Sequence, residues 1–221
     1  MQGIKAKKVC FYDKDGAQAF LAVWDDKAIL SFRGSQPLEE RGTRPLKLDF
    51  LRKLRITYFS ELDLDSRSLL FLSNDVLADL KFKLTDFDGV KDVKVHRGFL
   101  GEIDKIWPAI YDDISRHIGV VPIWVTGHSL GGAMATLAGM RYCFEEVVTF
   151  GEPRVGIHID QEFRAKSHTR YVNGDDPVTK VPPELLFSYD HHGNVVRVFG
   201  VNGQTDFRYD HAIVYYSENL A

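Results

Sequence analysis

The sequence contains few cysteines and no pattern of metal ligands. Cys10 and Cys143 are its two cysteines, and they lie far apart along the 221 residues. A disulfide framework requires several cysteines, and structural metal sites require cysteine and histidine at short, regular spacings. We therefore expect two reduced thiols, no bound metal and no other cofactor.

Long apolar runs and blocks of positive charge are also missing. No segment approaches the roughly 18 consecutive apolar residues of a membrane-spanning helix. The formal net charge is −3 at pH 7, which does not favour a nucleic-acid partner. Residues 1–8 are basic but precede neither an apolar core nor a cleavage site, so we expect no secretory signal. These absences predict a cytoplasmic protein without a transmembrane segment, which would be secreted only if a leader had been removed.

The remaining composition is typical of one globular domain. Hydrophobic residues make up 44% of the chain and charged residues 27%, and 221 residues suffice for one α/β domain with a sizeable core. Strand-like segments alternate with helical patterns, which predicts βαβ units and a mostly parallel central sheet with flanking helices. The predicted strands are 17–24, 28–32, 93–96, 121–125, 146–150, 169–172 and 195–201, and the predicted helices are 99–117 and 133–141.

Residues 36–73 interrupt this alternation. The segment mixes charged residues with many leucine and aromatic residues, and a connection of this length inside a compact domain is usually functional or separately structured. We therefore describe the chain as a single domain, 1–221, with an insertion at 36–73. A lid over a binding site, an extra hairpin and an oligomer contact all remain open for it.

The most informative motif is Gly127-His128-Ser129-Leu130-Gly131, which lies between a predicted strand and a predicted helix. A G-x-S-x-G elbow of this kind presents a serine hydroxyl at the end of a sheet, where a substrate carbonyl can reach it. Ser129 is therefore the candidate nucleophile, and the N–H of Leu130 is a candidate oxyanion donor. Ser35 follows another predicted strand and is the candidate second donor, because active groups gather at the carboxyl ends of parallel strands.

A serine nucleophile needs a histidine that accepts its proton and a carboxylate that orients the histidine. In α/β-hydrolases these residues follow the chain order serine, acid, histidine. Asp176 is the best acid, because it follows a predicted strand and precedes a proline, and Asp175 is its close rival. Of the eight histidines, His191, His192 and His211 follow this acid. His211 is the preferred base, and the other two remain alternatives.

Several segments, taken in order, resemble the class 3 lipase family, the fungal-lipase-like branch of the α/β-hydrolases. The matches run from about residue 17 to residue 216, which is nearly the whole chain. They comprise the oxyanion motif (32–35), the two segments after it (74–80 and 95–99), the elbow (126–132), the loop after the elbow (149–156), the acid loop (172–178) and Asp210-His211.

This resemblance implies an α/β-hydrolase fold and assigns individual residues. It places the acid at Asp176 and the base at His211, and it puts the other two candidate histidines in a different family segment. It also implies that Asp79 holds the hydroxyl of Ser35, and that the insertion carries the lid. The residues that fall where the family lines its acyl pocket are Val178, Val181 and Ala212.

The sequence departs from the family pattern at Val76 and Thr179, where tryptophan and proline are common. The connection 36–73 is also longer than usual, which indicates an enlarged lid.

The resulting expectation is a serine carboxylic-ester hydrolase, a lipase or esterase of lipid degradation. Its partner would be a lipid or another apolar acyl ester at a lipid–water interface, cleaved through an acyl-enzyme that water hydrolyses. Alternatives on the same fold are a feruloyl esterase, a phospholipase A1, an acyltransferase and a non-catalytic binding module.

Overall fold

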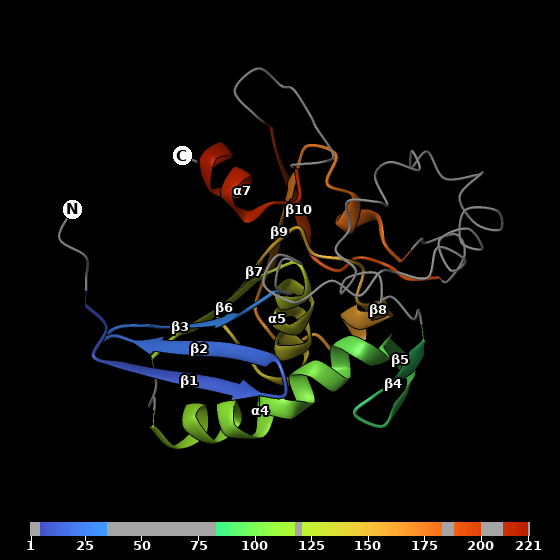
Figure 1. Cartoon of the computed structure of the whole chain (residues 1–221). Helices are drawn as coiled ribbons and strands as arrows, with labels where there is room; N and C mark the ends of the chain where they lie inside the picture. Colours follow the sequence, from blue (N-terminus) through green and yellow to red (C-terminus); the bar gives the residue numbers. More distant parts are fainter. Residues whose placement is uncertain (1–4, 35–82, 118–120, 183–187, 200–209, 221) are drawn as a thin grey trace.

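A computed structural model describes residues 5–34, 83–117, 121–182, 188–199 and 210–220 (Figure 1). The expected insertion at 36–73 lies outside the described residues, as do Ser35 and Asp79.

A seven-stranded sheet forms the centre of the described structure. Its strand order is β1-β2-β3-β6-β7-β9-β10. The first three strands are antiparallel, and the strands from β3 to β10 are parallel, so the predicted mostly parallel sheet is confirmed. The bounds are β1 (Lys8–Lys14), β2 (Ala17–Val23), β3 (Ala28–Phe32), β6 (Ile123–His128), β7 (Glu146–Phe150), β9 (His168–Asn173) and β10 (Asn194–Val198).

A second, three-stranded sheet corrects one prediction. The strand expected at 93–96 is the end of β5 (Val90–His96), which pairs antiparallel with β4 (Leu84–Phe87) and β8 (Gly156–Ile157) and lies outside the central sheet. Asp88 and Gly89 both have positive φ, which forms the tight turn between β4 and β5. The sequence analysis did not predict this hairpin.

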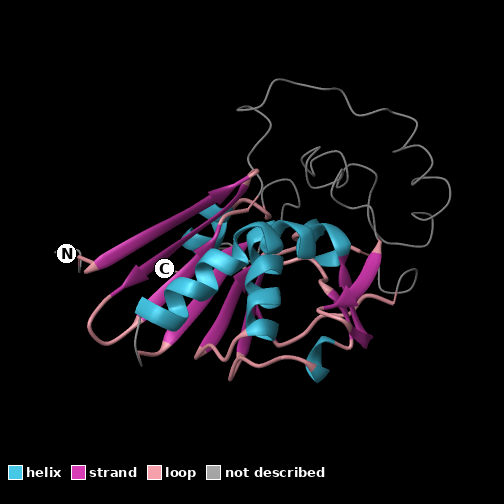
Figure 2. Cartoon of the chain, turned by 90° about the horizontal axis from the view of Figure 1, so that it is seen from below, coloured by secondary structure: helices cyan, strands magenta, loops and turns pink. Residues whose placement is uncertain are grey.

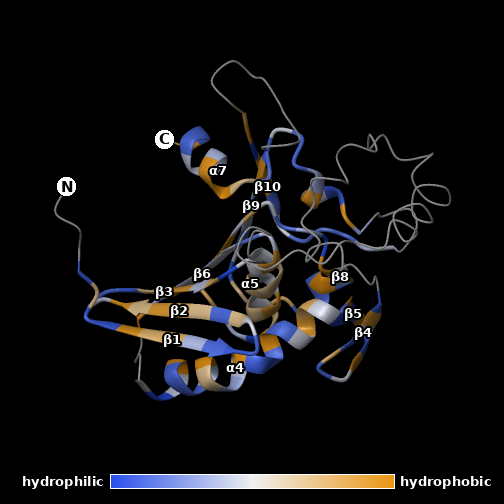
Figure 3. Cartoon of the chain, in the orientation of Figure 1, coloured by the Kyte–Doolittle hydropathy of each residue, from blue (hydrophilic) through white to orange (hydrophobic). Residues whose placement is uncertain are grey.

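Helices α4 (Arg97–His117) and α5 (Leu130–Arg141) cover one face of the central sheet (Figure 2). In α4 the predicted apolar stripe is buried, and it includes Ile103, Ile106 and Ile110. In α5 every residue from 131 to 140 is buried, because the helix lies between the sheet and α4. Figure 3 shows this difference in the colours of the two ribbons: hydrophilic and hydrophobic residues alternate along α4, whereas α5 has few hydrophilic residues.

The short helix α7 (Ile213–Asn219) lies against the opposite face, beside β9 (Figure 1). Side chains alternate between the two faces of a strand. In β7, Val147 joins the core beneath α4 and α5, whereas Phe150 points to the other face. There the ring of Phe150 contacts the rings of Tyr171 and Tyr216. Among the described residues, no helix is long and apolar enough to cross a membrane.

Candidate active site

Ser129 occupies the sharp turn between β6 and α5. Its φ of 57° and ψ of −126° lie outside the regions that non-glycine residues ordinarily adopt, and its side chain is almost fully buried. The flanking glycines are required by close packing. A Cβ on Gly127 would lie 2.1 Å from the carbonyl oxygen of Gly131, and a Cβ on Gly131 would lie 2.4 Å from that of Phe32. The strained elbow that the motif predicts is therefore present.

Asp176 and His211 form a hydrogen-bonded pair. The Nδ1 atom of His211 lies 2.9 Å from Oδ2 and 3.0 Å from Oδ1 of Asp176, which is completely buried. Asp176 also accepts hydrogen bonds from the N–H of Val178 (2.9 Å) and the hydroxyl of Tyr216 (2.6 Å). Burial alone would raise the pKa of Asp176, but the charge of His211 and these hydrogen bonds lower it below its usual value. Asp176 is therefore held as a carboxylate.

The end of β7 brings this pair to the sheet. Gly151 follows β7 with a φ of 57°, and a Cβ there would lie 2.7 Å from Oδ2 of Asp176 and 3.0 Å from Nδ1 of His211. The sequence analysis included Gly151 in a family-like loop but did not predict this contact. The sequence feature that could have indicated this contact is the glycine directly after a predicted strand, since an isolated glycine at such a position often marks a close approach of the backbone.

His128 connects the elbow to His211. Its Nε2 atom lies 2.7 Å from the carbonyl oxygen of His211, and the two rings are 4.6 Å apart between centroids. Since His128 and Ser129 are consecutive, this contact places the elbow beside the pair of Asp176 and His211. The structure thus brings the three expected triad residues to the same edge of the sheet.

The rival residues have other partners. Nε2 of His191 lies 2.8 Å from the carbonyl oxygen of Thr179, and Nδ1 of His192 lies 3.1 Å from Nδ1 of His168. Burial lowers the pKa of both His191 and His192 to about 4. Asp175 is exposed and lies 3.6 Å from Lys180. The rings of His191 and His192 thus have partners elsewhere, whereas Nδ1 of His211 meets the buried carboxylate of Asp176, which favours His211 as its partner.

The expected oxyanion donors are only partly described. Leu130 is the first residue of α5 and directly follows Ser129. Ser35 lies outside the described residues, but the chain leading to it passes the elbow: a Cβ on Gly34 would lie 2.7 Å from the carbonyl oxygen of His128 and 3.5 Å from Cβ of Ser129. Asp79, the expected partner of Ser35, is also outside the described residues.

The expected acyl-pocket residues differ in their exposure. Val178 and Val181 are fully buried, whereas Ala212 is exposed at the start of α7. Their role in binding an acyl chain stays a prediction. Among the described residues, no group of three or more histidine, cysteine and acidic side chains is arranged to hold a metal ion.

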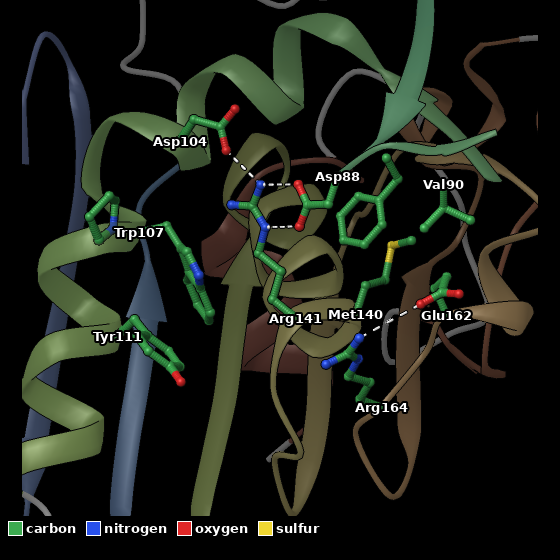
Figure 4. Close-up of a pocket in the computed structure, with 11 residues that line it drawn as sticks. Asp88, Val90, Asp104, Trp107, Tyr111, Met140, Arg141, Glu162 and Arg164 are labelled. Atoms are coloured by element: carbon green, nitrogen blue, oxygen red, sulfur yellow. Dashed lines mark hydrogen bonds and ion pairs between the residues drawn. The ribbon is translucent and has the colours of Figure 1, made fainter.

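A pocket of about 610 Å³ lies at the other end of α5, where Arg141 is held between α4 and the β4–β5 turn (Figure 4). The guanidinium of Arg141 donates to Asp88 at 3.0 and 2.8 Å and to Asp104 at 2.6 Å, and it stacks on the ring of Trp107. A twelve-residue helix spans about 18 Å, so this pocket is separate from the elbow at the first turn of α5. Its charged groups already pair with one another.

The fold and this arrangement define an α/β-hydrolase. The family model described as Lipase (class 3) matches residues 72–186, which is just over half of the sequence. The chain therefore belongs to the class 3 lipase family, as the motifs predicted.

Individual relatives agree with this assignment. A lipase of Rhizopus niveus is 34% identical over 133 residues, which cover 53% of this chain and 33% of that protein. The secreted mono- and diacylglycerol lipase 1 of Fusarium solani is 33% identical over 125 residues, which cover 52% of this chain and 37% of that protein. The crystal structure of a lipase from Rhizopus microsporus var. chinensis matches with a TM-score of 0.59 and 25% identity, covering 91% of this chain and 62% of that one. This chain thus spans only part of the length of these relatives.

Proposed function

We propose that this protein is a serine carboxylic-ester hydrolase in which Ser129, His211 and Asp176 form the catalytic triad. The observation that carries the proposal is the hydrogen bond between Nδ1 of His211 and the buried carboxylate of Asp176. When Nδ1 donates to the carboxylate, Nε2 is left as the unprotonated acceptor that a serine hydroxyl requires. Asp176 also stabilises the imidazolium that forms when His211 takes the proton.

The reaction follows from these roles. Ser129 Oγ attacks the ester carbonyl while its proton passes to His211, which then protonates the leaving alcohol. Water attacks the acyl-enzyme with His211 again as the base, and this step releases the acid and restores Ser129. The N–H of Leu130 and the hydroxyl and N–H of Ser35 would bind the oxyanion, with Asp79 holding Ser35; one such donor is typically worth about 3–4 kcal/mol of the barrier.

The substrate is a lipid or another apolar acyl ester, taken from a lipid–water interface. The names of the Rhizopus and Fusarium relatives support this class of substrate. The name of the Fusarium relative also supports a secreted location over the cytoplasmic one expected from the sequence. The same triad and oxyanion donors can also catalyse feruloyl esterase, phospholipase A1 and acyltransferase reactions. An assay must therefore separate these alternatives.

Hydrolysis of p-nitrophenyl esters of increasing acyl length tests the proposal. We expect turnover that rises with acyl length beyond acetate, and a loss of about 10⁴-fold or more in kcat for Ser129→Ala and for His211→Ala. Ser167→Ala is the matched control, because Ser167 is exposed directly before β9, at the opposite end of that strand from the site. Turnover that is absent in the wild type, or unchanged in Ser129→Ala, contradicts the proposal. Turnover that survives His211→Ala but not His191→Ala contradicts the choice of base.

A further inference from the structure

His128 has no chemical step in the proposed reaction, yet it lies between the nucleophile and the base. It is the last residue of β6, directly before Ser129. Gly127 packs against α5, so the alternation of side chains directs His128 to the opposite face of the sheet. On that face His128 is paired in register with Phe150 of β7, and α7 lies against the same region.

The side chain of His128 makes two kinds of contact with the acid–base pair. Its Nε2–H donates to the carbonyl oxygen of His211 at 2.7 Å. Its ring lies 4.6 Å from the ring of His211 at a tilt of 30°, and 5.9 Å from the ring of Tyr216, edge to face. Tyr216 in turn donates its hydroxyl to Asp176. The ring of His128 therefore contacts both His211 and Tyr216, the tyrosine that is hydrogen-bonded to Asp176.

The loop that carries His211 is anchored to two different strands. One residue earlier, the carbonyl oxygen of Asp210 accepts from Asn173 at 3.1 Å, and the carboxylate of Asp210 accepts from the N–H of Asp175 at 2.8 Å. These bonds fix the loop to the end of β9. The bond from His128 fixes the next peptide unit to the end of β6, which is the strand that also positions Ser129.

The electrostatics suit this role. Burial, with a smaller contribution from the charge of His211, lowers the pKa of His128 to about 4. His128 consequently stays neutral near pH 7, whereas His211 is expected to take up and release a proton during the reaction. A neutral imidazole can donate from Nε2 without placing a second positive charge beside the imidazolium of His211.

We propose that His128 is a positioning residue that fixes the distance between Ser129 and His211, through its hydrogen bond to the His211 carbonyl and the contact between the two rings. This inference rests on the proposed hydrolase function. Proton transfer requires the base within hydrogen-bond reach of the nucleophile, and small displacements of a base cost rate without changing substrate affinity. The loss of His128 should therefore lower kcat and leave KM unchanged.

Three variants separate the hydrogen bond from the ring. His128→Gln keeps an N–H donor near the position of Nε2 but loses the ring, His128→Phe keeps a ring but loses the donor, and His128→Ala loses both. We expect kcat per active site, counted by titration with an organophosphate, to fall about tenfold in His128→Phe and further in His128→Ala, at unchanged KM. We expect His128→Gln to retain more activity than His128→Phe. Melting temperatures show which variants are folded.

A second measurement does not depend on activity. Hydrogen–deuterium exchange of a peptide covering 210–216 should be about tenfold faster in His128→Phe than in the wild type. In His128→Gln the exchange of this peptide should be slower than in His128→Phe, because the hydrogen-bond donor is kept. If His128→Phe keeps both the wild-type kcat per active site and the wild-type exchange rate, the inference is wrong. If the wild type hydrolyses no ester, the proposed function fails, and the exchange rates alone then decide whether His128 holds the His211 loop.

Discussion

At the scale of single residues, a glycine lies directly against the candidate acid and base. Gly151 has a positive φ and lets the backbone after β7 touch both Asp176 and His211. Any side chain at this position would meet the carboxylate and the imidazole. The pair is therefore held in place from several directions, by the end of β7, by Tyr216 and by His128.

Gly151→Ala should reduce activity far more than it reduces stability. The added Cβ would lie 2.7 Å from Oδ2 of Asp176, so the pair must move, and the positive φ adds strain. We expect kcat for an ester substrate to fall by about 100-fold or more, since misplacement of a catalytic group by about 1 Å costs this much.

Gly101→Ala is the matched control for this substitution. Gly101 is exposed within α4, and a Cβ there meets nothing within 4 Å. Alanine is the better helix former, so the control should gain about 0.5–1 kcal/mol in unfolding free energy at unchanged kcat. Equal kcat values for the two variants would contradict the role given to Gly151.

At the scale of elements, α4 is capped by the histidine that directly precedes it. Nδ1 of His96 accepts from the N–H groups of Gly98 (3.1 Å) and Phe99 (3.3 Å), two donors that the first turn of a helix leaves without partners inside the helix. The His96 ring is fully buried and stacks on Phe99. This ring therefore satisfies the helix terminus from inside the core.

His96→Asn and His96→Ala test this cap. The Oδ1 atom of asparagine can accept in place of Nδ1, whereas alanine cannot, and both substitutions remove the ring. We expect His96→Ala to be less stable than His96→Asn by about 1 kcal/mol in chemical denaturation. Equal unfolding free energies for the two variants would show that His96 acts only through packing.

The elements differ in how well the sequence predicts them. Strands β3 and β7 occur at the predicted residues. Helices α4 and α5 begin two and three residues before their predicted starts and end where predicted. These elements are recognisable because apolar periodicity is strong in buried strands and amphipathic helices. The β4–β5 hairpin was missed although Asp88-Gly89 is a residue pair that two-residue hairpin turns favour, because this signal was not read together with the short strands on either side of it. β1 was missed because most of its residues are exposed at the edge of the sheet, where no alternation marks a strand.

At the scale of the whole molecule, burial holds four histidines of the described part of the chain neutral. The pKa values of His96, His128, His191 and His192 are each lowered to about 4, with burial as the largest cause. In the unfolded chain these groups have pKa values of about 6.5. The unfolded state therefore binds more protons than the folded state between about pH 6.5 and pH 4, and stability falls as the pH is lowered through this window.

Urea unfolding at pH 7 and at pH 5 should show this loss. For the fully buried His96 the contribution has an upper limit of about 1.4 kcal/mol per pH unit, and the partly exposed histidines contribute less. His191→Gln can retain a donor to the carbonyl of Thr179 but removes one titrating group, so its pH dependence should be weaker than that of the wild type. An unfolding free energy that is constant between pH 7 and pH 5 would contradict the burial of neutral histidines.

Chain order alone singled out Ser129 but left two aspartates and three histidines as candidates for the acid and the base, and the resemblance to the class 3 lipases then favoured Asp176 and His211. The structure brings these two residues together beside the elbow. Chain order was not sufficient for the groups that hold them. Tyr216, Gly151 and the contact of His128 depend on packing between β6, β7 and α7, which have no fixed spacing in the sequence. Motifs in the sequence therefore indicate the candidate reacting groups better than they indicate the residues that hold them in place.

The most direct test of the central claim is covalent labelling of the nucleophile. Diethyl p-nitrophenyl phosphate should transfer one diethylphosphoryl group to Ser129 Oγ with release of p-nitrophenol, because an activated serine attacks phosphorus as it attacks a carbonyl. Mass spectrometry should find one label per chain, on the peptide that contains Ser129, with no label in Ser129→Ala and slow labelling in Asp176→Ala. A label on another residue, or an equal extent of labelling in Ser129→Ala, would contradict the account.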